Sequence, residues 1–347
     1  MPIMQEVICE ANRVRFEPEL PKAYVLPNLL CTTEVAFKLK TSPHYLEAET
    51  PCIEWFNSFQ PFPTRSISDN FINLGNFARL AGLSFPNAGK SRLETGLAFY
   101  LWGFSVDDFF DNTSRSPSET EKDVELNTAV TLCDSIPNVG SPSAAVLHDL
   151  LKQFREDGSP GMVKRSQFIE GFHSWSKALI TQTKTRWNND IPSVDAFILM
   201  RRSTIGAEMA KAVMEYTIGI DLPDHVFDDP IVQGVFDATT DILTWPNDLC
   251  SFNKEQADGD FQNLVVVIMH ERGLDLQRAI FELEKMLKAR VDDYISLKSR
   301  LPSFGPEIDT ELGRYHENIE YCVQGIIQWH YESPVSTHYN VCDFSRI

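Results

Sequence analysis

Residues 274–291 read LDLQRAIFELEKMLKARV, and this stretch carries the clearest structural signal in the chain. Its apolar side chains recur at steps of 4, 3, 4 and 4 residues, and charged side chains fill the positions between them. The apolar set is Leu276, Ile280, Leu283, Leu287 and Val291. This spacing follows the period of an α-helix, so it predicts a helix with one buried face.

A helical pattern of apolar residues continues through most of the chain from residue 89 onward. Segments of roughly 15–25 residues with helical periodicity alternate with short connectors rich in proline, glycine and serine. The connectors lie at 113–120, 135–143, 156–161, 221–230 and 301–306. Alternating β-type runs and internal repeats are not visible. We therefore expect the 347 residues to form one all-α domain, residues 1–347.

The first ~85 residues are interrupted by prolines, which favour turns and extended connections over continuous helix. We expect residues 1–67 to be an irregular N-terminal segment that packs on the core. Residues 68–340 are expected to form the helical bundle itself.

Composition narrows the class of protein. The hydrophobic share of 43% is ample for a core, while the formal net charge of −18 excludes a surface built for nucleic acid or anionic membranes. The seven cysteines are odd in number and show no metal-ligand spacing, which favours a reducing compartment. The longest aliphatic run, at 264–269, is too short to span a bilayer, and the N-terminus does not resemble a targeting segment. We expect a cytoplasmic protein with no membrane span.

Three aspartates follow an apolar run in LWGFSVDDFFDNTS, residues 101–114. Asp107, Asp108 and Asp111 lie at the C-terminal end of a helix expected over 92–112, where the helix dipole disfavours negative charge. A bound cation would remove this conflict, and carboxylate oxygens suit Mg²⁺. The same acids also fit a solvated acidic surface, so the cluster alone leaves both interpretations open.

A second polar segment, WPNDLCSFNKE at 245–255, favours the metal interpretation. Asn247, Ser251 and Glu255 are spaced four residues apart, so a helix would align an amide, a hydroxyl and a carboxylate on one face. Asn and Ser have a low propensity for helix interiors, so a structural role alone explains them poorly. Oxygen ligands of these kinds can hold a second Mg²⁺. Lys254 lies beside them, in reach of a phosphate.

The two motifs together, DDFFD and NDLCSFNKE about 140 residues later, resemble those of class I terpene synthases, especially microbial and basidiomycete fungal ones. The segment MRRSTIG at 200–206 is similar to the diphosphate-sensor segment of that family. The resemblance implies that Arg202 is the diphosphate sensor, Ile205 the linker and Gly206 the effector whose carbonyl faces the substrate. It also implies three Mg²⁺ ions.

The resemblance further implies a helical bundle around a central active-site cavity. The implied activity is that of a Mg²⁺-dependent carbon–oxygen lyase that ionises farnesyl diphosphate and releases a sesquiterpene, as hydrocarbon or alcohol, plus diphosphate. Arg202 and Lys254 would hold the diphosphate. Phe77, Phe104 and Trp329 match family positions that shape the hydrocarbon pocket, where aromatic faces stabilise a carbocation.

One expected element of the family is missing. The family usually has an Arg-Tyr pair about 80–90 residues after the metal-binding asparagine, but Arg314-Tyr315 comes only 67 residues after Asn247. We regard that match as a coincidence and identify His338-Tyr339 as the nearest equivalent for binding diphosphate. Because His offers fewer donors and a weaker charge than Arg, we expect weaker closure of the site and an acyclic or hydroxylated product.

The sequence motifs also allow other functions. A monoterpene or acyclic terpene alcohol synthase of the linalool or nerolidol type, accepting geranyl and farnesyl diphosphate, fits the same motifs. A prenyl-chain-elongating synthase and a Mg²⁺-dependent diphosphate hydrolase are further enzymatic alternatives. A non-catalytic acidic helical scaffold is the alternative from another class. The expected partner is a small isoprenyl diphosphate, and the chain is expected to be a monomer or homodimer.

Overall fold

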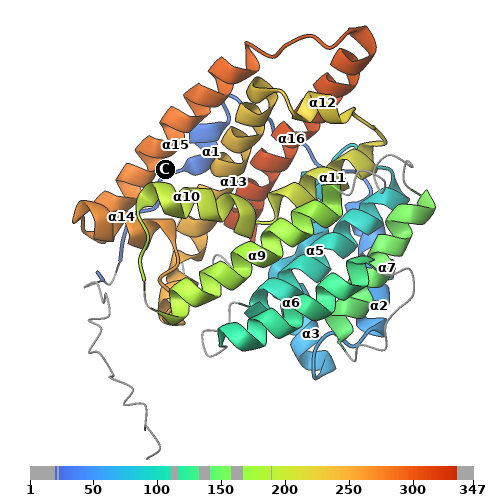
Figure 1. Ribbon diagram of the computed structural model, residues 1–347, viewed down its shortest axis with the longest axis horizontal. Helices are drawn as coiled ribbons and strands as arrows, with labels where there is room; N and C mark the ends of the chain where they lie inside the picture. The colour runs from blue at the N-terminus through green and yellow to red at the C-terminus, as the bar shows by residue number, and fades with distance from the viewer. Residues whose placement is uncertain are drawn as a thin grey trace, which may run out of the picture.

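The structure is a computed structural model that describes residues 20–21, 23–110, 116–132, 141–157, 167–188 and 190–333. Within these ranges the chain forms helices joined by short connections, with no strand (Figure 1). The all-α expectation is therefore confirmed.

The helices of the described ranges follow one another in this order: α1 (Leu29–Thr33), α2 (Tyr45–Ser58), α3 (Arg65–Gly75), α4 (Phe77–Ser84), α5 (Lys90–Phe110), α6 (Pro117–Leu132), α7 (Pro142–Asp157), α9 (Gln167–Trp187), α10 (Val194–Thr204), α11 (Ala207–Ile218), α12 (Asp224–Phe227), α13 (Pro230–Ala257), α14 (Leu264–Arg272), α15 (Leu276–Lys298) and α16 (Pro306–Glu332).

Helix α15 forms as its periodicity predicts. Asp275 caps its N-terminus by accepting a hydrogen bond from the backbone N–H of Arg278 at 2.9 Å. All five residues of the apolar set are at most 2% exposed. Figure 1 shows α15 running along the edge of the molecule beside α14, and its buried face packs on α13.

The expectation of an irregular segment over 1–67 is wrong for part of its length, because α1, α2 and the start of α3 lie within it. Helix α2 continues through Pro51, which costs one backbone hydrogen bond. Ala48, Cys52 and Phe56 are spaced four residues apart and are buried on the side of α2 that packs near α4 and α5. Burial of this apolar stripe offsets the cost of the proline.

One cluster of buried apolar side chains runs through the described chain from Leu29 to Trp329. Helices α4 and α16 approach closely within it, since a Cβ at Gly325 would lie 2.7 Å from the backbone oxygen of Leu83. The start of α4 also lies beside the end of α16, because the rings of Phe77 and Trp329 are 6.5 Å apart. Across the described ranges, none of the helices has the length and apolar character needed to cross a membrane.

Candidate active site

A cavity of about 630 Å³ lies inside the bundle, between α3, α4, α5, α9, α10, α11, α13 and α16. This volume is in the usual range for small-molecule sites. Its wall is mostly aromatic and aliphatic, but polar side chains gather along one part of it. That polar group comprises Asp107, Arg201, Asn247, Ser251, Lys254 and Glu255.

Asp107 reaches the cavity from the last turn of α5, with Phe104 one turn earlier on the same wall. The structure thus places Asp107 where a metal ligand is predicted, and its role stays a prediction. The side chain of Asp108 lies outside the described residues, as do Asp111, His338 and Tyr339 entirely.

The predicted triad lines the cavity from consecutive turns of α13. Asn247, Ser251 and Glu255 all face it, as their four-residue spacing predicts. Burial raises the pKa of Glu255 to about 8, with the nearby Asp248 adding to the shift. A cation bound here would favour the charged carboxylate, so the electrostatics of the triad suit a metal ion.

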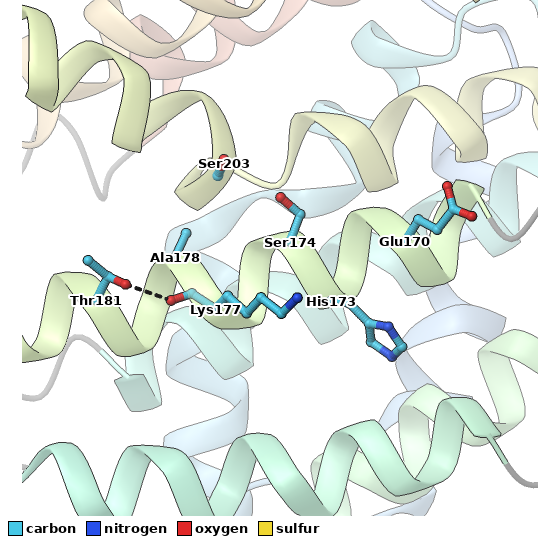
Figure 2. Close-up of a pocket in the computed structure, with 7 residues that line it drawn as sticks. All are labelled: Glu170, His173, Ser174, Lys177, Ala178, Thr181 and Ser203. Atoms are coloured by element: carbon cyan, nitrogen blue, oxygen red, sulfur yellow. Dashed lines mark hydrogen bonds between the residues drawn. The ribbon is translucent and has the colours of Figure 1, made fainter.

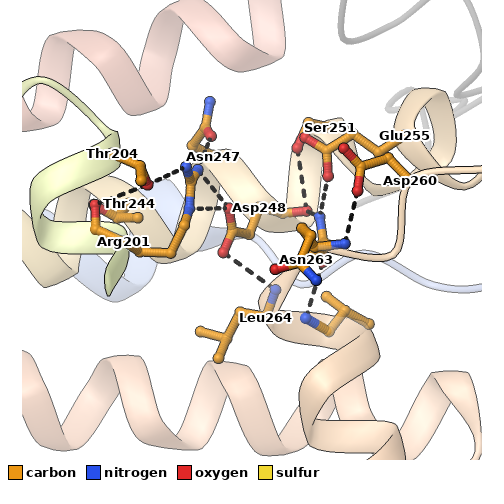
Figure 3. Close-up of polar contacts among 12 residues, drawn as sticks. Arg201, Thr204, Thr244, Asn247, Asp248, Ser251, Glu255, Asp260, Asn263 and Leu264 are labelled. Atoms are coloured by element: carbon orange, nitrogen blue, oxygen red, sulfur yellow. Dashed lines mark hydrogen bonds and ion pairs between the residues drawn. The ribbon is translucent and has the colours of Figure 1, made fainter. Parts of the chain in front are cut away.

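Asn263 supports the triad by contacting Glu255, a contact that the sequence did not predict (Figure 3). It is fully buried, and its side-chain amide donates to Glu255 Oε2 at 2.8 Å and to the backbone oxygen of Asp248 at 2.5 Å. Its side-chain oxygen caps α14 by accepting from the N–H of Val265 at 2.9 Å. The cap thereby ties the start of α14 to the predicted metal ligand on α13.

Arg201 lines the cavity, whereas Arg202 is not among the described lining residues. The Arg201 guanidinium donates to Asp248 Oδ1 from Nε at 3.0 Å and from Nη2 at 2.7 Å, and Nη2 also donates to Asn247 Oδ1 at 2.9 Å (Figure 3). Burial alone would lower the pKa of Arg201, but Asp248, Glu255 and Asp107 outweigh it, so the pKa is raised. Arg201 therefore lies within electrostatic reach of both predicted metal-binding segments.

The predicted contact of Arg202 with diphosphate stays a prediction, and the structure places this side chain away from the cavity. Its guanidinium forms a two-pronged pair with Asp241, at 2.7 Å for each bond, and it is absent from the described residues that line the cavity. Successive helix residues point about 100° apart, and on α10 this turns Arg201 toward the cavity and Arg202 toward Asp241. The sequence contained a partial signal, because Arg201 comes four residues after Phe197 and three before Thr204, and both of those residues are buried.

The break between α10 and α11 forms part of the cavity wall, as Thr204, Ile205 and Gly206 all line it. Gly206 has φ 74°, a left-handed conformation that favours glycine. Trp175 from α9 donates its indole N–H to the backbone oxygen of Thr204 at 3.0 Å. The predicted linker and effector residues thus lie on the cavity, and their roles stay predictions.

The three predicted aromatic residues meet in one cluster. Phe77 and Phe104 have ring centroids 5.1 Å apart, and Trp329 lies 5.5 Å from Phe104 and 6.5 Å from Phe77. The indole N–H of Trp329 donates to the backbone oxygen of Gly75 at 2.8 Å. This bond fixes the indole while its ring lines the cavity.

Comparison with known proteins identifies the family. The family model described as "Terpene synthase family 2, C-terminal metal binding" matches residues 98–293. The chain is 30% identical over 319 residues to sesquiterpene synthase 1 of Postia placenta, covering 90% of each chain. It is 29% identical over 316 residues to sesquiterpene synthase Agr1 of Cyclocybe aegerita, covering 90% of this chain and 88% of that one. The chain belongs to the terpene synthase family.

Solved structures agree on the fold of this terpene synthase. A crystal structure of a-eudesmol synthase matches with a TM-score of 0.77 at 20% identity, over 86% of this chain and 98% of that one. Germacradien-4-ol synthase from Streptomyces citricolor matches with a TM-score of 0.74, also at 20% identity and over the same shares. The isoprenoid synthase helical fold expected from the motifs is therefore confirmed.

The donor set of this terpene synthase suits a hard cation. The described ligand candidates are carboxylate, amide and hydroxyl oxygens, the donors that Mg²⁺ prefers. No three His, Cys, Asp or Glu side chains of the described residues form a ready metal cluster. The described ligand candidates lie on two helices, Asp107 on α5 and the triad on α13, and their role as metal ligands stays a prediction.

Arg314 and Tyr315 of the synthase serve the fold. Arg314 pairs with Glu311 at 2.7 Å and donates to the backbone oxygen of Ile218 at 2.9 Å. Tyr315 is fully buried and donates its hydroxyl to the backbone oxygen of Lys211 at 3.2 Å. Neither is among the described cavity-lining residues, in keeping with the view that this Arg-Tyr match is a coincidence.

A second hollow of the synthase, about 520 Å³, lies on the other side of α9 and is much more open (Figure 2). Ser203 of α10 lines it together with α9 side chains that include His173 and Lys177. Its lining is largely polar and lacks the aromatic wall of the main cavity. Of these two hollows, only the main cavity combines an apolar wall with predicted metal ligands.

Proposed function

We propose that this terpene synthase is a Mg²⁺-dependent carbon–oxygen lyase that ionises farnesyl diphosphate and releases a sesquiterpene and diphosphate. The observation that carries the proposal is the cavity itself, which joins an aromatic wall to a polar group of oxygen ligands and one buried arginine. The curated relatives named above are sesquiterpene synthases, which supports a fifteen-carbon substrate.

The polar group would receive the leaving diphosphate. Mg²⁺ bound by Asp107 and by the triad of Asn247, Ser251 and Glu255 supplies neutralising charge at the leaving group; we propose three ions. Arg201 is permanently charged and offers a fork of donors that matches phosphate oxygens. Lys254 lines the same part of the cavity and would add a further cation. Charge neutralisation in a site shielded from water is the largest contribution expected to the rate.

The aromatic wall would receive the hydrocarbon cation. Phe77, Phe104 and Trp329 present ring faces, which attract positive charge and carry no lone pair that would trap it. A carbonyl oxygen at the α10–α11 break, as proposed for the effector Gly206, would also stabilise the cation. The cavity thus orients the two ends of the substrate by charge and by shape.

The reaction is proposed to run in the cytoplasm. None of the four cysteines that the structure describes forms a disulfide, as expected in a reducing compartment.

Incubation with geranyl, farnesyl and geranylgeranyl diphosphates plus Mg²⁺ tests the proposal, with diphosphate release measured and organic products separated by gas chromatography and mass spectrometry. We expect turnover of farnesyl diphosphate to fifteen-carbon products. The variant Asn247→Ala should lose turnover while keeping its fold. Asn253→Ala is the matched control, because Asn253 is on the same helix and is not among the cavity-lining residues. Full turnover by Asn247→Ala would remove the assignment.

A further inference from the structure

The two arginines at the end of α10 make separate sets of contacts. Arg201 contacts the triad helix inside the cavity, whereas Arg202 contacts the same helix about two to three turns earlier, through Asp241 and Asp237. The last turn of α10 is therefore attached to α13 at two points. One attachment includes a predicted metal ligand, and the other contains none.

Asp241 is the centre of the second attachment. It is 2% exposed, and both of its oxygens are occupied. Oδ1 accepts from Arg202 Nε at 2.7 Å, and Oδ2 accepts from Arg202 Nη2 at 2.7 Å and from Arg290 Nε at 2.8 Å. A buried carboxylate that accepts three charged hydrogen bonds fixes the planes of both guanidinium groups. We call Arg202, Asp241 and Arg290 the α10 clamp.

The clamp joins three helices, because Arg202 is on α10, Asp241 on α13 and Arg290 on α15. Arg290 and Arg202 are both mostly buried, at 18% and 24% side-chain exposure. Asp237 also accepts a bond from Arg202, at 2.7 Å, but it is 51% exposed. Solvent screens that outer pair, so it should contribute little.

The clamp lies directly beside groups that face the cavity. Arg202 follows Arg201 in the chain and comes two residues before Thr204, the last residue of α10. Beyond it, the chain turns at Ile205 and Gly206, which line the cavity. A shift of the last turn of α10 would therefore move Arg201 and the cavity-lining break at 204–206 together.

We propose that the α10 clamp is a positioning device for the reaction, which holds Arg201 and the cavity-lining break at 204–206 in register with the triad on α13. Arg202 and Asp241 are positioning residues in this account, since neither touches the cavity. The inference rests on the proposed function for its kinetic consequences. Small misplacements of reacting groups can lower rates by about 100-fold, so a loosened clamp should be visible in turnover and in product composition.

The variant Asp241→Asn tests the clamp, with Asp237→Asn as the matched control on the same helix and the same arginine. Farnesyl diphosphate with Mg²⁺ is the substrate, and kcat, KM and the product ratio are measured. Amide hydrogen exchange of the peptide covering 201–210 is followed by mass spectrometry without substrate. We expect Asp241→Asn to lower kcat by about tenfold or more, to change the product ratio and to speed exchange of that peptide. Asp237→Asn should stay within about twofold of the unmodified chain.

Arg202→Lys gives a second test in case Asp241→Asn does not fold. It keeps the charge and leaves Asp241 paired with Arg290, but it loses the two-pronged bond, so the same changes are expected in smaller degree. The proposal is overturned if the folded variants keep kcat, KM, product ratio and exchange within about twofold of the unmodified chain. If the unmodified chain turns over none of the prenyl diphosphates, the proposed function fails, and exchange at 201–210 still decides the clamp.

Discussion

Replacement of Asn263 by serine should weaken Mg²⁺ binding without unfolding the protein. Serine retains a side-chain oxygen that can cap α14, and Ser and Asn are about equally good N-cap residues. It removes the amide that donates to Glu255 Oε2 at 2.8 Å and to the backbone oxygen of Asp248 at 2.5 Å. The variant therefore isolates the support of the predicted metal ligand from the cap of the helix.

The magnitude follows from the contact that is lost. A hydrogen bond to a charged group contributes about 1.5–3 kcal/mol, and loss of a partner that orients a metal ligand typically weakens metal binding by about 10–100-fold. The two figures agree, since tenfold corresponds to about 1.4 kcal/mol. Loss of the donor also raises the pKa of Glu255 above its value of about 8, so protons compete more strongly with Mg²⁺ at neutral pH.

The assay is the Mg²⁺ dependence of diphosphate release from farnesyl diphosphate. We expect the half-saturating Mg²⁺ concentration of Asn263→Ser to rise by about 10–100-fold, with kcat largely recovered at saturating Mg²⁺. Asn28→Ser is the matched control, because Asn28 caps α1 by accepting from the N–H of Cys31 at 3.3 Å and is not among the cavity-lining residues. An unchanged Mg²⁺ dependence in a folded Asn263→Ser protein would refute the reasoning.

Two further predictions concern stability. Gly325→Ala should lower the free energy of unfolding, measured in urea, by about 1–3 kcal/mol, because the new Cβ would lie 2.7 Å from the backbone oxygen of Leu83. Gly313→Ala on the same helix is the control: its Cβ meets nothing within 4 Å, so the free energy of unfolding should rise by about 0.5–1 kcal/mol. Burial, with Lys298 nearby, lowers the pKa of His316 to about 4, so the unfolded chain binds its proton first and stability falls as pH drops from 6.5 toward 4. His316→Asn should reduce the stability lost between pH 7 and pH 5 by about 2 kcal/mol in urea unfolding. An equal loss in this variant and in the unmodified chain would contradict this.

The sequence predicted the helices whose apolar faces are regular. The stripe from Leu276 to Val291 needed only local periodicity, and the four-residue spacing of Asn247, Ser251 and Glu255 placed them on one face of α13. Helix α2 was missed because Pro51 is a local signal against helix, and only packing against α4 and α5 outweighs it. Local periodicity does not predict which distant segments pack together.

The site shows the same division between local and distant information. Arg202 was chosen by its position in a motif, yet the phase of Phe197, Arg201 and Thr204 indicates which arginine faces inward. Asn263 was beyond reach, because its contact with Glu255 depends on how the connection after α13 folds back on that helix. Asp241 of the clamp was likewise beyond reach, because its contact with Arg202 depends on α10 lying against α13.

A crystal structure with Mn²⁺ and diphosphate tests the central claim most directly, because Mn²⁺ takes the same oxygen ligands as Mg²⁺ and gives anomalous scattering. The account predicts anomalous peaks at the carboxylate of Asp107 and among the oxygens of Asn247, Ser251 and Glu255, with diphosphate between them and in contact with Arg201. Peaks confined to the outer surface, or diphosphate bound away from α5 and α13, would contradict it.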